Sequence, residues 1–219
     1  MANPNEDEGS ERVLGRPRVT THDRLAEVGV DLFTRLGYAN VSVEQIAEAA
    51  GVSRRTFFRY FPSKSDLPWG DFEKEVARLR SELARVRDDV PLMVALRHAV
   101  VEFNRVPAAG IDDHRARLTL ILTEPELIAR SQVKYQHWRE AVAEFVGRRL
   151  DHPTDSFLPQ LVGEVALGAA VAAYRQWLPS HSADLPAFMD AAFEAITNLD
   201  SLEGVETGDG GQRPSLPHG

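Results

Sequence analysis

The chain has 219 residues, of which 43% are hydrophobic, and it carries a formal net charge of −8 and no cysteine. This length can bury one sizeable core, or one large domain and a small one. The lack of cysteine excludes disulfides, a thiolate nucleophile and cysteine-ligated zinc. The acidic N-terminus, MANPNEDEGSER, lacks the basic and apolar regions of a signal peptide, so we expect a cytoplasmic protein.

The most apolar run, from Val165 to Tyr174, has about half of the ~20 residues that a membrane span needs. We therefore expect no membrane partner. Charge is distributed unevenly along the chain. Between Arg12 and Asp66, nine basic residues stand against six acidic ones, a balance of +3, which leaves −11 for the remainder. An acidic protein is a poor general partner for nucleic acid, but a basic segment can still bind it.

Residues 1–18 and 203–219 are rich in glycine, proline and polar residues without apolar periodicity, which predicts a disordered arm and a disordered tail. Between them the apolar spacing predicts helices alone, and therefore an all-α fold. The first helix begins at Thr20 or Thr21 and ends at Gly37. A second begins at Ser42, which forms a capping box with Gln45.

The second helix ends at Gly51, and a third begins at Ser53 and stops before Pro62. We expect the next helix to run from Ser63 to about Val86, with a bend at Pro68. The later predicted helices are marked by apolar positions over Leu92–Phe103, Arg115–Thr123, Ile128–Phe145, Leu161–Trp177 and Phe188–Leu199.

The two short helices between Ser42 and Tyr60, joined by the sequence AGVS, predict a helix-turn-helix. Phe57 and Phe61 lie four residues apart and can face the core. The residues left to face outward are Ser53, Arg54, Arg55, Thr56, Phe58 and Arg59.

These outward residue types suit the major groove of double-stranded DNA. Arginine can donate two hydrogen bonds to guanine, serine and threonine can bind a base edge or a phosphate, and an apolar group can contact a thymine methyl. Lys64 offers a further phosphate contact at the start of the next helix. Arg16 and Arg18, on the N-terminal arm, could reach a neighbouring minor groove.

The segment SVEQIAEAAGVSRRTFFRYFPSKSDL resembles the DNA-binding head of the TetR family of bacterial transcriptional regulators, and the resemblance extends over roughly Thr21–Phe72. It implies an all-α homodimer with a three-helix DNA-binding domain, here 19–66. A helical domain, here 67–202, would bind a small effector that releases DNA. By matching positions, the DNA-contacting residues are Ser42, Ser53, Arg54, Arg55, Thr56, Arg59, Tyr60 and Lys64. Phe58 departs from the family, which often has tyrosine there, so a hydroxyl contact to phosphate is in doubt.

The segment RRTFFRYFPSKSDLPWGDF is similar to the head-to-body junction of mycofactocin-system regulators within that family. Those regulators are associated with acyl-CoA-like ligands, so the resemblance implies an apolar effector of this kind. The phosphates of such a ligand would need cations at a pocket mouth. Candidates are Arg97, Arg105, Arg130, Lys134 and Arg139, each of which also suits a solvent-exposed helix face.

Aromatic residues at helical spacing suit either a core or a pocket with a few polar groups. The residues we expect to bind the effector are Phe72, Phe103, Asn104, Ser131, Tyr135 and Trp138. The small residues between Gly163 and Ala173 allow helices to approach closely, either within the chain or across a dimer. The family resemblance favours a homodimer through the last two helices.

The sequence contains no G-x-S-x-G, no glycine-rich phosphate loop and no H-E-x-x-H, so we expect no catalytic residue, metal site or cofactor. The main prediction is a ligand-responsive repressor on a pseudo-palindromic operator. Three alternatives stay open. The first is an activator of the same fold, and the second is an all-α adaptor that binds proteins. The third is a small hydrolase or lipid-handling enzyme that uses the aromatic cavity.

Overall fold

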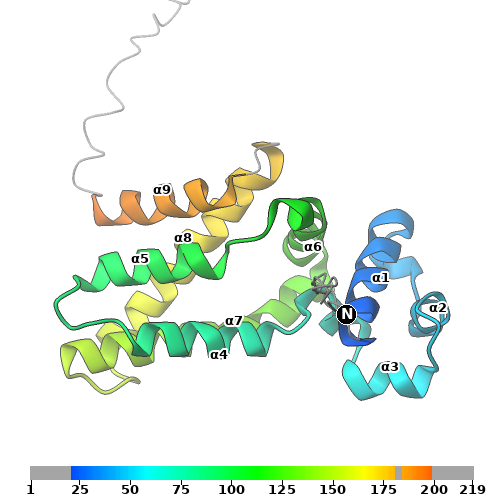
Figure 1. Ribbon diagram of the computed structural model, residues 1–219, viewed down its shortest axis with the longest axis horizontal. Helices are drawn as coiled ribbons and strands as arrows, with labels where there is room; N and C mark the ends of the chain where they lie inside the picture. The colour runs from blue at the N-terminus through cyan, green and yellow to red at the C-terminus, as the bar shows by residue number, and fades with distance from the viewer. Residues whose placement is uncertain (1–20, 181–183, 199–219) are drawn as a thin grey trace, which may run out of the picture.

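The computed structural model describes residues 21–180 and 184–198, and this part of the chain is helical without a strand (Figure 1). The all-α prediction is confirmed. The predicted disordered arm and tail, with Arg16 and Arg18, lie outside the described residues. The α-helices of the described part are α1 (Thr21–Leu36), α2 (Val43–Ala49), α3 (Arg54–Tyr60), α4 (Phe72–Ala84), α5 (Leu92–Phe103), α6 (Ile111–Thr123), α7 (Pro125–Leu150), α8 (Phe157–Trp177) and α9 (Leu185–Thr197). The 3₁₀ turns there are η1 (Tyr38–Asn40), η2 (Lys64–Trp69), η3 (Ala108–Gly110) and η4 (Leu178–Ser180).

Helices α1 to α3 form a small head at one end of the molecule (Figure 1). The predicted capping box is present, because the backbone N–H of Gln45 donates to Ser42 Oγ at 3.2 Å and that of Ser42 donates to Gln45 Oε1 at 2.8 Å. Gly51 then turns the chain with φ of 70°, a conformation that favours glycine. The sequence therefore specifies this helix-turn-helix locally, residue by residue.

Aromatic side chains hold the head together. Phe33, Phe57 and Phe61 are buried, and burial of a phenylalanine side chain contributes about 1.5–3 kcal/mol. The same hydrophobic cluster includes Leu120 from α6 and Leu127 from α7. The core of the head therefore continues into the body, so that movement of α6 or α7 can be transmitted to the head.

The link between head and body differs from the prediction of one bent helix from Ser63 to Val86. The chain instead forms η2, breaks at Gly70, whose φ is 49°, and begins α4 at Phe72. Pro68 cannot donate the backbone hydrogen bond that a continuing α-helix needs, and Gly70 adopts a backbone conformation that other residues rarely take. The junction is therefore a break between two separate elements.

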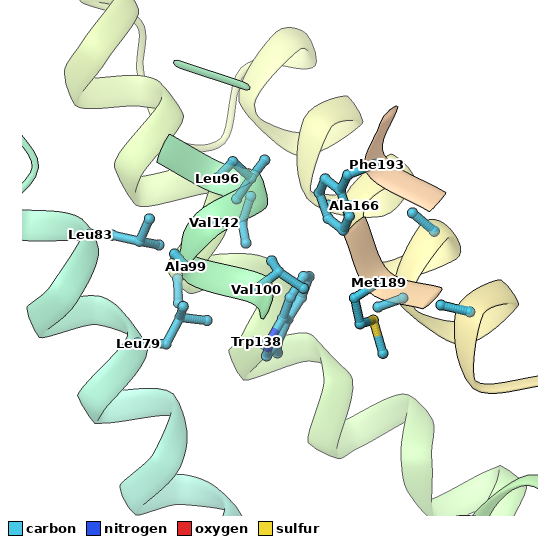
Figure 2. Packing of buried hydrophobic residues seen from close by; sticks show 14 of the residues in the cluster. Leu79, Leu83, Leu96, Ala99, Val100, Trp138, Val142, Ala166, Met189 and Phe193 are labelled. Carbon is cyan, nitrogen blue, oxygen red and sulfur yellow. The ribbon is translucent and has the colours of Figure 1, made fainter. Parts of the chain in front are cut away.

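The body buries a second hydrophobic cluster between α4, α5, α7, α8 and α9 (Figure 2). Trp138 and Val142 of α7 lie at its centre, with Leu96 and Val100 of α5 packed beside them. Met189 of α9 lies on the side away from α4. The long helix α7 therefore contributes buried residues along the body, from the end beside the head to the opposite end.

By length and composition alone, the segment Phe157–Ser180 could span a membrane, and it is longer than the apolar run that the sequence analysis considered. Within the protein, α8 packs against both α7 and α9. Its buried positions include Ala166, Ala170 and Trp177. A core helix with one buried side accounts for this composition.

Candidate functional site

The outward side of α3 carries three arginines that differ in their contacts. Arg55 is exposed and makes no hydrogen bond or ion pair within the described residues. Arg59 donates to the hydroxyl of Tyr60 at 3.3 Å and lies over that ring. Arg54 differs, since its Nε is 3.1 Å from Glu44 Oε1 of α2. Arg55 and Arg59 are thus the α3 cations most available to an external anion.

The two serine hydroxyl groups predicted to contact DNA both take part in helix capping. Ser53 Oγ accepts from the backbone N–H of Thr56 at 3.0 Å and lies 3.0 Å from Thr56 Oγ1. Ser42 caps α2 in the same way. These side chains hold the helix N-termini in place, and their DNA contacts stay predictions.

The other head residues predicted to contact DNA are partly exposed and partly engaged in contacts within the head. Phe58 is 44% exposed, as predicted for an outward residue, and Tyr60 is half-buried. Lys64 Nζ donates to the carbonyls of Tyr38 at 3.0 Å and Val41 at 3.1 Å. Lys64 therefore has a structural role in the head besides any phosphate contact.

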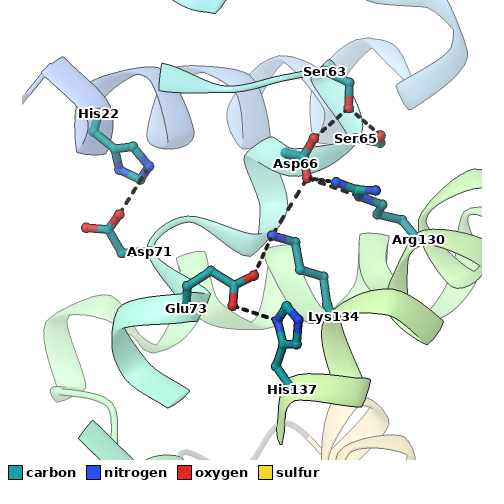
Figure 3. A network of polar contacts seen from close by, with 9 residues as sticks. All are labelled: His22, Ser63, Ser65, Asp66, Asp71, Glu73, Arg130, Lys134 and His137. Carbon is teal, nitrogen blue, oxygen red and sulfur yellow. Dashed lines mark hydrogen bonds and ion pairs between the residues drawn. The ribbon is translucent and has the colours of Figure 1, made fainter. Parts of the chain in front are cut away.

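A network of charges joins η2 of the head to α7 of the body (Figure 3). Asp66 is buried and accepts hydrogen bonds from Arg130 Nη2 at 2.7 Å and from Ser63 Oγ at 2.8 Å. Burial raises the pKa of the Asp66 carboxyl, but these hydrogen bonds outweigh it and hold the pKa below its usual value. Lys134 links this carboxylate to Glu73 of α4, with Nζ 3.8 Å from Asp66 and 3.1 Å from Glu73.

A second head-to-body contact pairs His22 Nε2 of α1 with Asp71 Oδ1 at 3.3 Å (Figure 3). Together with Asp23, these side chains place three possible metal-ligand atoms within 4.8 Å of one another. Sequence reasoning missed this group because Asp71 is far from His22 and Asp23 in the chain. Exposed acids gather in this way without a metal, and the ion pair itself explains the arrangement.

A cavity of about 380 Å³ opens in the body beside the junction. Its volume lies within the ~300–1,000 Å³ range of small-molecule sites. The aromatic and polar residues that line it include Trp69, Phe72, Phe103, Asn104, His114, Arg117, Tyr135 and Tyr174, together with the charged residues Asp71, Glu75, Arg78 and Arg105. The lining comes from η2, α4, the end of α5, α6, α7 and α8, so a ligand there would contact the elements that join head and body.

Four of the six predicted effector residues meet at this cavity: Phe72, Phe103, Asn104 and Tyr135. Trp138 lies behind Phe103, at 6.5 Å between ring centroids, and lines a small adjoining hollow. Ser131 is not among the lining residues, and its hydroxyl donates to the carbonyl of Ile128 at 2.6 Å. Ser131 faces the same seam of α7, but it lies one helical turn too close to the head.

Two polar groups of the cavity already satisfy each other. The hydroxyl of Tyr174 donates to Asn104 Oδ1, and Asn104 Nδ2 donates to the carbonyl of Val100 at 2.8 Å. Asn104 therefore has less capacity for a ligand than its sequence position suggests. Burial also raises the pKa of Tyr135 to about 12, so its hydroxyl stays protonated and can act as a donor.

The cations proposed for ligand phosphates are all paired with carboxylates. The pairs are Arg97 with Asp190, Arg105 with Glu102, Arg130 with Asp66, Lys134 with Glu73, and Arg139 with Glu164. Sequence reasoning missed Arg117 and His114, which line the cavity from α6. Their separation of three residues was a usable signal for a shared helix face, but nothing local indicated that this face meets the cavity.

Comparison with known proteins fits this architecture. The profile of the family "Bacterial regulatory proteins, tetR family" matches residues 25–67, and that of "MftR C-terminal domain" matches residues 90–199. The "Putative mycofactocin biosynthesis transcriptional regulator MftR" of Mycobacterium tuberculosis is 42% identical over 190 residues, which cover 86% of this chain and 96% of that protein.

Solved structures of two fatty-acid regulators share the fold. Thermus thermophilus FadR, a repressor solved with lauroyl-CoA, is 22% identical, with a TM-score of 0.52 over 90% of this chain and all of that one. Bacillus subtilis FadR, solved with stearoyl-CoA, is 18% identical, with a TM-score of 0.57 over 80% of this chain and 97% of that one. This chain belongs to the TetR family of transcriptional regulators and carries the MftR type of C-terminal domain.

Proposed function

We propose that the protein is a ligand-responsive repressor that binds a pseudo-palindromic operator as a homodimer and is released by an acyl-CoA. It would act in the cytoplasm and without catalysis. The observation that carries the proposal is the exposed, unpaired Arg55 on a short capped helix of a helix-turn-helix. An arginine in this position can bind guanine with two hydrogen bonds. Residues 19–66 would form the DNA-binding unit, and residues 67–202 the effector and dimer unit.

A homodimer is supported by an apolar stripe along α8. Leu158, Leu161 and Val165 are each about 40% exposed, and Gly168 and Ala172 continue the same side of the helix. A Cβ placed on Gly168 would meet nothing within 4 Å, so a second helix has room to approach. The counterpart of α8 and α9 in a second copy suits this stripe. Two recognition helices could then reach successive major grooves, ~34–36 Å apart.

An acyl-CoA effector is supported by the aromatic cavity and by what the two FadR structures hold. The cavity is lined by η2 and by the start of α4, the two elements that lead out of the head. A ligand there would favour one arrangement of head and body over another. It can shift DNA binding only through its different affinity for the two arrangements.

The first test is a fluorescence-anisotropy titration of operator DNA. Probes would cover the region upstream of the protein's own gene and the regions upstream of mycofactocin biosynthesis genes, with scrambled competitor and a salt series. Arg55→Ala should weaken specific binding by about 1–3 kcal/mol and relax preference at one base pair. Arg35→Ala on α1 is the matched control, because it removes the same charge from an exposed arginine that is paired with Asp31.

The outcomes separate the candidate functions. Specific binding that long-chain acyl-CoAs release supports the whole proposal, whereas specific binding without release removes the effector class. If Arg55→Ala and Arg35→Ala bind alike, Arg55 is not a base contact. Equal affinity for scrambled DNA at low salt would favour the protein-binding adaptor. A reporter gene that loses expression when the protein is deleted would identify an activator.

A further inference from the structure

One arginine in the cavity wall stands apart from the others. Arg78 pairs with Glu75 and Glu82, and Arg105 pairs with Glu102. Arg117 lines the same cavity but makes no hydrogen bond or ion pair within the described part of the chain. The wall of the cavity therefore holds one cation that no protein carboxylate neutralises at contact distance.

Arg117 is held close to the head-to-body junction. Its Nη1 lies 3.0 Å from the point where a Cβ on Gly70 would stand, so the guanidinium packs against the turn that links η2 to α4. His114 lies three residues earlier on α6, on the same side of the helix. The group thus sits where the first residues of the body meet the head.

Two further nitrogen atoms of this wall have no hydrogen-bond partner among the residues that the structure describes. They are Nε1 of Trp69 and Nε2 of His114, and both are buried. Trp69 is 6% exposed and directly precedes Gly70. Buried polar atoms in native proteins are nearly always paired, so each exception calls for a partner. Arg117, His114 and Trp69, all in the wall of one cavity, each have a nitrogen without a hydrogen-bond partner among the described residues.

We propose that Arg117, with the ring nitrogens of His114 and Trp69, binds the anionic head of an amphipathic effector. The ligand class is an apolar chain that ends in a carboxylate or a phosphate, with the chain among Phe72, Phe103 and Tyr135. The inference rests on the proposed effector function and adds the chemistry of its recognition. The planar guanidinium matches both anions, and hydrogen bonds between charged groups are stronger than neutral ones.

The same arginine connects the anion to the head. Arg117 also lines a second hollow of about 720 Å³ between α1 and α6, together with the carboxylates of Glu27, Asp31 and Asp113. Burial lowers the pKa of Arg117, and the charges of Asp113 and Glu27 oppose that effect. An anion in the cavity would compete with these carboxylates for the guanidinium. Binding would therefore reduce the attraction between α6 and α1.

The test compares three probes that share one dodecyl chain: lauroyl-CoA, laurate and dodecanol. Binding would be measured by calorimetry on the full chain, with Arg117→Gln, Arg117→Lys and the control Arg105→Gln. Arg117→Gln should weaken the binding of the anionic probe by about 10–100-fold, the range for a charged hydrogen bond. Dodecanol affinity should change by less than about twofold in every variant, since it has no charge to lose. Arg117→Lys should recover part of the lost affinity.

If the affinity for laurate falls in Arg117→Gln, the recognised headgroup is a carboxylate. If the affinity for lauroyl-CoA falls instead, it is a phosphate. The inference is overturned if Arg117→Gln binds both anionic probes as tightly as the wild type does. It is also overturned if its affinity for dodecanol falls by the same factor as its affinity for the anionic probes. It is also overturned if the wild type binds none of the three. Operator titration of the same preparations shows separately whether the regulator function stands.

Thermal unfolding gives an independent check. Replacing an unpaired, partly buried charge should leave the midpoint of thermal unfolding unchanged or raise it. A clear fall in the midpoint of Arg117→Gln, relative to Arg105→Gln, would mean that Arg117 has a structural partner, and would overturn the inference.

Discussion

The outer side of α3 and the cavity wall at α6 both present an unpaired arginine, with opposite energetic consequences. Arg55 is exposed, so water solvates its charge and the folded protein loses little by leaving it unpaired. Arg117 is partly buried, and the nearby charges of Asp113 and Glu27 compensate its desolvation only in part. An unpaired arginine on the head therefore needs no special explanation, whereas the unpaired arginine in the body supports the proposed binding of an anionic ligand.

The buried carboxylate at the head-to-body junction shows the opposite arrangement. Asp66, which is 5% exposed, is surrounded by Arg130, Lys134 and Ser63. The fold can therefore supply partners at the junction where it needs them. This contrast makes the isolation of Arg117 informative, and it can be tested by removing partners one at a time.

The largest expected effect comes from Asp66→Asn. The change removes the carboxylate that Arg130 and Lys134 share; Lys134 keeps Glu73, but Arg130 loses its carboxylate partner at the junction. We expect the free energy of unfolding to fall by about 2–3 kcal/mol, below the 3–5 of a fully buried pair because Arg130 is partly exposed. Urea denaturation at pH 7 measures the change.

Asp31→Asn is the control for this prediction, because it breaks an exposed pair of similar length, 2.9 Å, with Arg35. Its cost should stay below about 0.5 kcal/mol. Equal costs for Asp66→Asn and Asp31→Asn would show that the junction network contributes no more than a surface ion pair.

Gly70→Ala should have the next largest effect. At φ of 49° and ψ of −137° an alanine is strained, and its Cβ would lie 3.0 Å from Arg117 Nη1. We expect a loss of about 1–2 kcal/mol in the free energy of unfolding, from backbone strain alone if Arg117 moves aside. The variant therefore tests how firmly the guanidinium is held against the turn.

Gly110→Ala provides the comparison, since Gly110 has φ of −108° and its added Cβ would meet Val106 at an ordinary 3.6 Å. Its effect should stay within about 0.5 kcal/mol. Combining Gly70→Ala with Arg117→Gln should recover the part of the loss that comes from contact. No recovery would assign the whole loss to backbone strain.

The head could be predicted from sequence because its determinants are local. Ser42 and Gln45, Gly51, and Phe57 with Phe61 each act within a few residues, and the structure has all of them as expected. The helices of the body were also found, but the expected seam of α7 begins with Ile128, which is 43% exposed. Periodicity identifies a helix more reliably than it identifies which end of the helix is covered.

The cavity could be predicted only in part. The aromatics were found because apolar residues at helical spacing must face something, and Phe72, Phe103 and Tyr135 do face the cavity. The pairing of charges around the cavity could not be predicted from the spacing of residues along the chain. Which arginine has a carboxylate opposite depends on contacts between helices, such as Arg97 with Asp190, ninety-three residues apart. Whether a carboxylate lies opposite Arg117 cannot be read from its neighbours in the chain, so sequence reasoning had no reason to select it.

The smallest expected effect concerns His114, beside Arg117. Burial, with a smaller contribution from the charge of Arg117, lowers the pKa of His114 from 6.5 to about 4. The unfolded chain therefore takes up this proton at a higher pH than the folded protein does. Stability from this group is complete above pH 6.5 and is lost as the pH falls toward 4. Between pH 7 and pH 6 we expect the wild type to lose about 0.7 kcal/mol more than His114→Gln, and the difference should grow at pH 5.

Urea denaturation of both proteins at pH 8, 7, 6 and 5 measures this difference, with pH 8 as the reference at which protonation of His114 contributes nothing. Parallel pH profiles would show that the cavity wall tolerates a second cation beside Arg117, and would weaken the contrast between head and body. If laurate or lauroyl-CoA binds at Arg117, the same series with ligand should show a smaller loss. A bound anion compensates the charge that His114 gains, so the folded protein then takes up the proton more easily.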